Sequence, residues 1–571
     1  MSNEENIHTT EKSMEDEEEL NGTKQQKEQG SSTLQEETNG CLNSVSSKDD
    51  HANYQKQEAI SLNGMTAVII NGDGHPSSSE AKEDPTTMRT YEGGGPFAIE
   101  LDERDQAEVV IKSAKERLRD KVFVPRNSLL TDLYQVSHFN TIYHIFIAFL
   151  VILVLHTLVY DFVESGRINL GLGPITAGFG KFHYASLIWF SMLFSTLGAY
   201  AVFGIWVRMR RTFRKAHLNR LWNIGGFTSF VLYQCIFMAL VIQVLLRLDL
   251  PPASSVVVLA EMTRFIMKFH AFVRSNMRRL SDIDKILKAT NQAQPNHSEA
   301  KLELSFSHYI YFLFVPVLVY RDEYPRTERI RWSVVFQHVL EIVGIIFYIS
   351  FLLERFLMPL FQDIGKEQTS LVHLILNIFR SIVPASLIYM CLFYCMLHSW
   401  MNTLAELLQF ADRLFYRDWW NASSFPDYIR AWNVIVYDWL YTYVYKDSAE
   451  HWFKNCRPLA MVLVFTLSAF YHEVILAFAF QFFYPVMFMQ FAIIGLILMF
   501  SMKNFGKSLG NIFLWTLLLF GSGILLSLYS MEYYARRNCP ISDRSLSGYL
   551  TPVSWSCNGI FGNTNWTVSD P

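Results

Sequence analysis

Charged residues are scarce in this chain. Asp, Glu, Lys and Arg make up 18% of its 571 residues, against roughly 25% in soluble domains. Half of the residues are hydrophobic, 45 are Phe, and the formal net charge is −4. This composition predicts an integral membrane protein with lipid partners, and no nucleic-acid partner is expected.

Two further features are missing. The seven cysteines include no CxxC pair, so no metal site and no cofactor are expected. The N-terminus shows no basic segment followed by an apolar one. We therefore expect no cleavable secretory signal, and the first membrane span would act as the targeting signal.

The first 120 residues differ from the rest. They are rich in Glu, Lys, Gln, Ser, Asn and Gly, and the segment 15–19 consists entirely of Asp and Glu. Such a segment cannot bury enough apolar surface to offset its chain entropy. Residues 1–120 are predicted to form a disordered acidic tail.

Long apolar runs begin near residue 141. Most are close to the roughly 20 residues that a helix needs to cross a bilayer. The fourth run carries three charged residues on one helical face, so it could be a span that faces protein or an interfacial helix. The nine runs are 141–163, 184–205, 225–247, 253–272, 333–353, 382–400, 458–481, 483–501 and 512–530. The sequence predicts an all-α protein with about nine spans, over residues 121–535.

The loop cations predict the orientation. Lys and Arg cluster after the second, fourth and eighth runs, whereas the segment after the first run has only Arg167 and Lys181. Cytosolic loops carry the excess of Lys and Arg. The N-terminus and the segments 273–332 and 401–457 are thus expected in the cytosol, and the tail 536–571 in a lumen. An oxidising lumen favours a disulfide between Cys539 and Cys557, although two free thiols are the alternative.

His472 and Glu473 interrupt the seventh run near its middle. Ionisable groups within a span are costly and usually face the protein interior or a water-filled cavity. His472 could be a core histidine that bonds a neighbouring helix. It could also be a general base, because imidazole suits proton transfer near neutral pH.

The predicted cytosolic segment 401–457 holds the string "FYRDWWN" at 415–421, followed by "RAWN" at 430–433. Cations, amides and aromatic rings in this segment suit a bulky, polyanionic, nucleotide-like ligand. The alternative is an interfacial amphipathic helix with its Trp and Tyr at headgroup level.

"FYRDWWN", "RAWN" and "AFYHE" around His472 resemble the membrane-bound O-acyltransferase superfamily, in its sterol and diacylglycerol O-acyltransferase branch. The resemblance runs from about 122 to 557. Three stretches favour the sterol enzymes: "TIYHIFIAFL" (141–150), "LPPASSVVVLAEMTRFIMKFHAFVR" (250–274) and "YIYFLFVPVLVYRDEYPR" (309–326). The ending "ARRNCP" with "SWSC" also resembles them, and in those enzymes this cysteine pair is bridged.

The resemblance implies roles for single residues. His472 would be the catalytic base and Asn433 would position or polarise the thioester. The positions that hold acyl-CoA in the family are Asp427, Arg430, Asn433, Tyr437, Tyr445, Arg457 and Ser468. The motif residues Phe415, Tyr416, Asp418, Trp419, Trp420 and Asn421 would support the CoA entrance, with aromatic rings at headgroup level and Asp418 fixing the backbone. His138 stands where the family has a histidine near the sterol.

Three of these positions depart from the family pattern. Tyr437 stands where vertebrate sterol enzymes have His, and Arg457 where they have Lys. Asp427 replaces an Asn that contacts CoA, and a carboxylate there would repel phosphates.

The expected activity is transfer of a long-chain acyl group from acyl-CoA to a sterol 3-hydroxyl. The alternatives are an acyltransferase that uses diacylglycerol or a long-chain alcohol, and a lipid transporter in which His472 relays protons. The resemblance also implies an endoplasmic reticulum membrane and a homodimer or homotetramer. Asn565, within a luminal N-x-S/T sequence, is a candidate for glycosylation.

Overall fold

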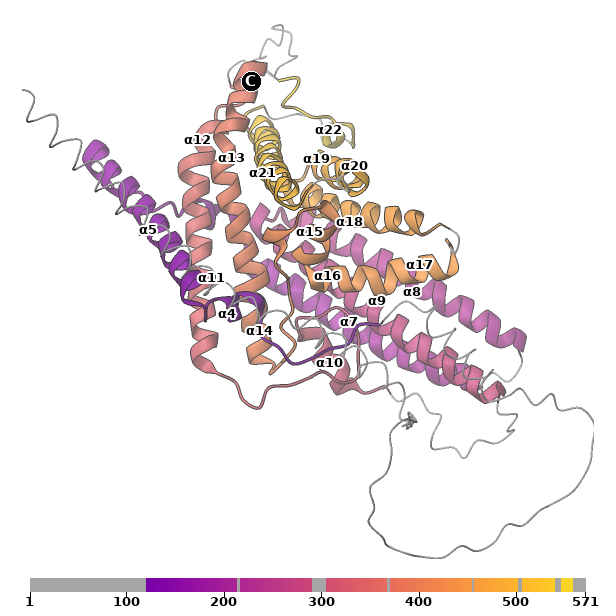
Figure 1. Cartoon of the computed structure of the whole chain (residues 1–571). Helices are drawn as coiled ribbons and strands as arrows, with labels where there is room; N and C mark the ends of the chain where they lie inside the picture. Colours follow the sequence, from indigo (N-terminus) through magenta and orange to yellow (C-terminus); the bar gives the residue numbers. More distant parts are fainter. Residues whose placement is uncertain are drawn as a thin grey trace, which may run out of the picture. The chain divides into compact units, whose positions relative to one another are not determined.

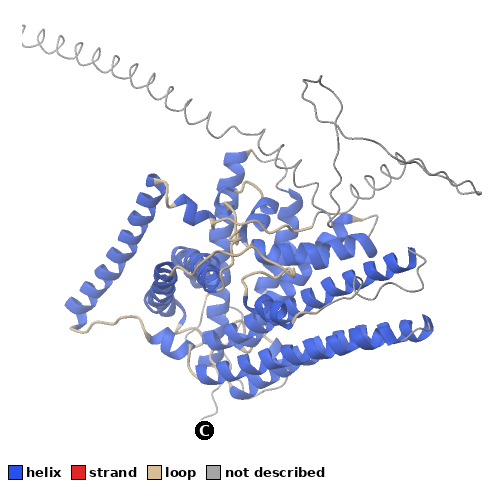
Figure 2. Ribbon diagram, turned by 90° about the horizontal axis from the view of Figure 1, so that it is seen from below, coloured by secondary structure: helices blue, strands red, loops and turns tan. Residues whose placement is uncertain are grey.

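The structure is a computed structural model. It describes residues 120–212, 216–289, 304–366, 370–453, 456–501, 506–539 and 546–557. The predicted acidic tail, apart from Asp120, and Asn565 lie outside these residues. The described part contains helices and no strand, and Figure 2 shows helices joined by loops.

The helices of the first half are α4 (Leu129–Leu133), α5 (Ser137–Ser165), α6 (Gly173–Gly178), α7 (Phe182–Thr212), α8 (Ala216–Leu248), α9 (Pro252–Ala289), α10 (Phe306–Phe314), α11 (Trp332–Leu352), η2 (Leu353–Leu357) and α12 (Met358–Phe361). Those of the second half are α13 (Leu371–Phe393), η3 (Tyr394–Trp400), α14 (Met401–Leu407), η4 (Trp419–Asn421), α15 (Phe425–Trp432), α16 (Val434–Trp439), η5 (Leu440–Tyr445), α17 (Lys446–His451), α18 (Arg457–Phe480), α19 (Val486–Phe488), η6 (Met489–Ile494), α20 (Gly495–Ser501), α21 (Lys507–Asn538) and α22 (Leu546–Leu550).

Seven of the described helical stretches are long and apolar enough to cross a membrane. They are Ser137–Glu164, Phe182–Arg210, His217–Leu248, Trp332–Phe361, Leu371–Leu407, Arg457–Phe480 and Lys507–Asn538. The other two predicted runs are also helical: the fourth lies in the charged helix α9, and the eighth in the shorter stretch Val486–Ser501. The all-α, polytopic architecture is confirmed, and the predicted number of nine spans is approximate.

Helix α9 lies at the centre of the packing and touches α7, α8, α10 and α18. Two of its cationic side chains form hydrogen bonds inside the protein. The Lys268 ammonium donates to the carbonyl oxygens of Phe312 (2.5 Å) and Val315 (2.7 Å), and the Arg264 guanidinium donates to that of Leu313 (2.6 Å). The last carbonyls of α10 have no partner within their own helix, so these cations cap its C-terminal end.

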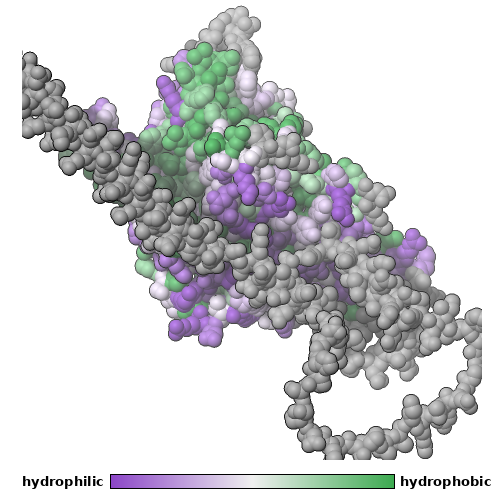
Figure 3. Space-filling model, in the orientation of Figure 1, coloured by the Kyte–Doolittle hydropathy of each residue, from purple (hydrophilic) through white to green (hydrophobic). Residues whose placement is uncertain are grey.

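Helices α13 and α21 pack along each other, as Figure 1 shows. Small residues permit the close approach: Ser381 Oγ lies 2.5 Å from Ser527 Oγ, and a Cβ added at Gly523 would lie 2.8 Å from Ile382. Figure 3 shows hydrophobic residues gathered over this pair, whereas hydrophilic residues gather near α15 and α16. The polar surface therefore coincides with the segment that was predicted to bind acyl-CoA.

Candidate active site

Three aromatic rings of the "FYRDWWN" motif are buried within the protein. Phe415, Tyr416 and Trp419 are at most 1% exposed. Phe393 of α13 lies edge-on to Tyr416 and Trp419, with both pairs of ring centroids 5.0 Å apart. These three rings fill the gap between α13 and the loop before α15, so they pack inside the protein, and their expected place at headgroup level stays a prediction.

The carboxylate that fixes the backbone near the motif is that of Asp412, not that of Asp418. Asp418 is exposed, and its side chain accepts no hydrogen bond from the described residues. Asp412 is buried, and it accepts from the backbone N–H of Val124 (3.1 Å) and Leu414 (3.3 Å) and from Arg126 Nε (2.7 Å). The role expected of Asp418 thus belongs to Asp412, which ties the first described segment to the motif.

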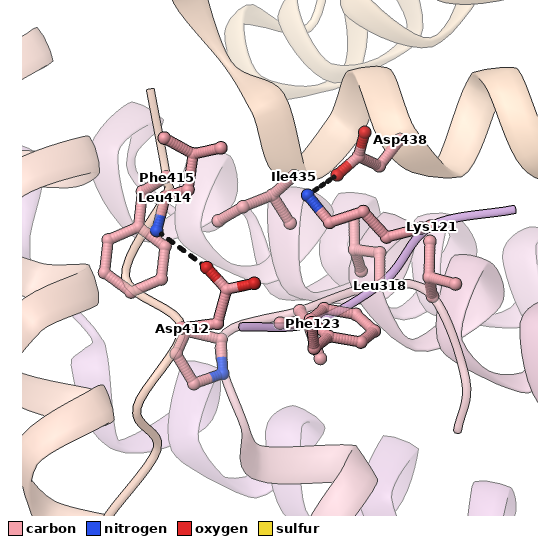
Figure 4. A pocket seen from close by; sticks show the side chains of 11 residues that line it. Lys121, Phe123, Leu318, Asp412, Leu414, Phe415, Ile435 and Asp438 are labelled. Carbon is pink, nitrogen blue, oxygen red and sulfur yellow. Dashed lines mark hydrogen bonds and ion pairs between the residues drawn. The ribbon is translucent and has the colours of Figure 1, made fainter. Parts of the chain in front are cut away.

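Figure 4 shows a cavity of about 20 Å³ beside the motif, between the Lys121–Asp438 ion pair (2.7 Å) and Asp412. Burial raises the pKa of Asp438, against the opposing effect of Lys121. The cavity has room for about one water molecule. It is too small for a coenzyme and is therefore not the substrate site.

Three tyrosines form a stack on the α16–η5 segment. The rings of Tyr437 and Tyr441 lie 6.2 Å apart with planes 16° from parallel, and those of Tyr441 and Tyr445 lie 5.7 Å apart at 18°. All three are half-buried. Burial raises the pKa of Tyr437, so it stays a neutral phenol at physiological pH. Tyr441 was not predicted as a site residue, although its spacing of four residues from Tyr437 and Tyr445 could have indicated it.

Asp427 is paired with Arg430. Its carboxylate accepts from Ser424 Oγ (2.6 Å) and from Arg430 (2.6 Å), and these two contacts lower its pKa. The pair carries no net charge, so it offsets the expected repulsion between Asp427 and phosphates. Arg457 lies exposed at the start of α18, where a cation can meet an anionic ligand.

Asn433 lies at the junction of α15 and α16. Its Oδ1 accepts from the backbone N–H of Val436 at 3.2 Å, so the side chain caps α16. The described residues offer no acceptor to its Nδ2 group, and the side chain is half-buried. Asn433 can therefore hold the helix with its oxygen and donate to a ligand with its amide nitrogen.

His472 lies in α18, where one ring nitrogen is already in use. Its Nδ1 is 2.7 Å from the carbonyl oxygen of Ser468, one turn earlier. A carbonyl only accepts, so Nδ1 carries the proton and Nε2 keeps a free lone pair. The ring of Phe491 stacks on the imidazole with centroids 5.0 Å apart. The histidine is thus oriented as a neutral base.

Glu473 points to a different set of partners. It is 4% exposed, and its carboxylate accepts from the backbone N–H of Phe488 (3.1 Å) and from the Tyr529 hydroxyl (3.1 Å). These contacts fasten α18 to α19 and α21. Glu473 therefore fixes the helix that carries His472, a role that a polar residue mid-span could have suggested.

Some of the predicted site residues lie on neighbouring elements. α18 packs against η5, which carries Tyr441 and Tyr445, and against η6, which carries Phe491. No hydrogen bond joins Asn433 to His472 in the described part. His138 is exposed in the first turn of α5 and contacts none of the other predicted site residues.

The disulfide between Cys539 and Cys557 is present and confirms that prediction. Tyr549, between the two cysteines, reaches α18: its hydroxyl donates to the carbonyl oxygen of Ala477 at 2.8 Å. The bridged segment is thus packed against the end of α18 opposite Arg457.

Residues 258–531 match the model of the membrane-bound O-acyltransferase family. Sterol O-acyltransferase 1 of Mus musculus is 39% identical over 444 residues, which cover 77% of this chain and 80% of the mouse protein. Sterol O-acyltransferase 2 of Homo sapiens is 39% identical over 442 residues, which cover 77% of this chain and 81% of the human protein. These matches confirm the resemblance drawn from the motifs. The chain belongs to the membrane-bound O-acyltransferase family, within its sterol O-acyltransferases.

Proposed function

We propose that this protein transfers a long-chain fatty acyl group from acyl-CoA to the 3-hydroxyl of a sterol, forming a steryl ester. The observation that carries the proposal is the free Nε2 lone pair of His472, held in the middle of an apolar helix. The similarity to sterol O-acyltransferases supports the choice of acceptor.

The reaction starts at the sterol hydroxyl, which is a poor nucleophile until its proton is removed. His472 Nε2 accepts that proton as the oxygen attacks the thioester carbonyl. The carbonyl oxygen then gains negative charge, and Asn433 Nδ2 donates a hydrogen bond to it. The thiolate of coenzyme A leaves and takes up the proton from His472. The reaction requires no metal or prosthetic group at these residues.

The tyrosine stack and two exposed arginines are proposed to bind acyl-CoA. Tyr437, Tyr441 and Tyr445 offer flat half-buried faces, and Arg430 and Arg457 are exposed. Aromatic rings stack on nucleobases, and guanidinium groups bind phosphates. Ser468, half-buried one turn before His472, lies where the acyl chain would pass.

The protein is proposed to reside in the endoplasmic reticulum membrane, with a cytosolic N-terminus and a luminal C-terminus. The disulfide at Cys539 supports this orientation, since bridges persist in an oxidising compartment. The family resemblance implies a homodimer or homotetramer. His138 stays proposed as a sterol contact.

A competition assay tests the acceptor. Microsomes that contain the full chain receive labelled acyl-CoA with equal amounts of cholesterol, diacylglycerol and a long-chain alcohol. We expect label in steryl ester above all. Preferential labelling of triacylglycerol or wax ester would overturn the sterol assignment, and the absence of any ester would overturn the acyltransferase assignment.

A further inference from the structure

A second polar cluster lies inside the protein, away from the residues assigned to acyl transfer. His338 and Glu341 come from α11, and His398 comes from η3, which packs against α11. His338 is 7% and His398 is 2% exposed. One ligand atom from each of the three side chains lies within 4.8 Å of the other two. Two imidazoles and a carboxylate thus converge in a buried place.

The hydrogen bonds around this cluster leave ligand nitrogens free. Glu341 Oε2 accepts from Ser399 Oγ (2.7 Å) and lies 2.9 Å from His338 Nδ1. His398 Nδ1 lies 2.7 Å from the hydroxyl of Tyr416. No described residue bonds the Nε2 atom of either histidine. His338 Nδ1 and Glu341 Oε2 therefore face each other as two ligand atoms, and His398 offers Nε2 as the third.

We propose that His338, Glu341 and His398 form a binding site for a divalent transition-metal ion, with Zn²⁺ as the best match. Two histidines and one glutamate are a known zinc ligand set that leaves a fourth position open. The outer contacts also fit. Ligating histidines hydrogen-bond through their second nitrogen and ligating carboxylates are themselves hydrogen-bonded, as Tyr416 and Ser399 provide here.

The charge of the cluster favours a bound cation. Glu341 brings one negative charge into the interior, and an ion bound there would compensate it. The bound ion would join α11 to η3 and, through Tyr416, to the "FYRDWWN" motif. Its role is therefore to brace this part of the protein rather than to take part in acyl transfer.

Metal content tests the proposal. The full chain is purified in detergent, equilibrated with Zn²⁺, freed of excess metal and analysed by elemental mass spectrometry. We expect about one zinc per chain, lost in His338→Gln and in Glu341→Gln. The matched control is His156→Ala, which removes an exposed histidine from another span, α5, and should keep the zinc. Equal zinc in the wild type and both variants, or none in the wild type, would overturn the site.

Two further measurements test the site even if His338→Gln or Glu341→Gln folds poorly. Wild-type protein loaded with Co²⁺ should show the visible absorption of a four-coordinate ion, and a spectrum of hexaaquo Co²⁺ alone contradicts the proposal. Ser399→Ala removes the donor to Glu341 Oε2 and leaves the bond from Gln337 to Oε1 in place. It should weaken Zn²⁺ binding about 10- to 100-fold while leaving the ion bound at high concentration. An unchanged affinity in this variant would show that the carboxylate is not a ligand.

Discussion

The "FYRDWWN" motif and helix α18 are both rich in aromatic residues, but they differ in how many of the polar atoms around them are hydrogen-bonded. In the motif region Asp412 accepts four hydrogen bonds, and the Tyr416 hydroxyl contacts both His398 and the backbone N–H of Leu130. The exception is the indole N–H of Trp419, which is buried without a partner. On α18 and at the N-cap of α16, His472 Nε2 and Asn433 Nδ2 make no hydrogen bond with the described residues. The motif region thus uses most of its polar atoms for packing, whereas the second region keeps two polar atoms for the proposed chemistry.

The difference has a physical basis. A buried polar atom that is already hydrogen-bonded stabilises the fold and has little capacity left for a substrate. An atom with spare capacity costs stability, so it persists where binding or catalysis uses it. Substitutions in the motif region should therefore lower stability, and substitutions at His472 and Asn433 should lower turnover.

The largest expected effect on turnover belongs to His472→Ala. Removal of the general base should lower kcat by about 10²- to 10⁴-fold. The unfolding temperature should stay close to that of the wild type, because the side chain loses a single bond to the carbonyl of its own helix. Steryl ester formation and thermal unfolding of the purified protein give the two values. His156→Ala serves as the control, and near-normal turnover in His472→Ala would return this residue to the role of a core histidine.

Asn433 offers a sharper test because its role as the cap of α16 can be separated from its proposed role as a donor to the thioester oxygen. Asn433→Asp keeps the oxygen that caps α16 but removes the amide donor. We expect kcat to fall about 10²- to 10³-fold, with a smaller change in KM for acyl-CoA. Asn433→Ala should lose the cap as well and unfold at a lower temperature. If Asn433→Asp turns over normally, the side chain acts as a helix cap alone.

Much of the architecture could be predicted from the sequence. Apolar runs of about 20 residues gave the helices, because the bilayer sets their length. Two runs show the limit of this argument. The charges of α9 left a protein-facing span and an interfacial helix open, and the structure buries Lys268 against the carbonyls of α10. Helix Val486–Ser501 is too short to count as a span by length.

The site was predicted less completely. His472 could be singled out since an ionisable residue mid-span is rare. Asp412 could not, because its partners Val124 and Arg126 lie almost 290 residues earlier in the chain. The cluster of His338 with His398 was missed for the same reason: it depends on the contact between α11 and η3. Pairings between distant segments are set by packing, which no local pattern reveals.

Substitutions in the motif region should lower stability rather than turnover, which is the opposite of the effect expected for His472→Ala. Asp412→Asn removes a buried charge that accepts from two backbone N–H groups and Arg126. The loss should lower the free energy of unfolding by about 1.5–3 kcal/mol, while folded molecules keep most of their turnover. Asp418→Asn, at the exposed carboxylate of the motif, should change it by less than about 0.5 kcal/mol. Equal effects of the two variants on thermal unfolding would remove the distinction drawn between them.

The smallest expected effect concerns Tyr441, which lies between the packed and the reactive region. Tyr441→Leu removes the middle ring of the stack with Tyr437 and Tyr445. If the stack holds the nucleobase of acyl-CoA, KM for acyl-CoA should rise about 10-fold at nearly constant kcat, since one base–aromatic contact is worth about 1–3 kcal/mol. Tyr441→Phe keeps the ring and should behave as the wild type. A KM that is unchanged in Tyr441→Leu would show that the three rings only pack against one another, and the stack would then belong with the motif rather than with the site.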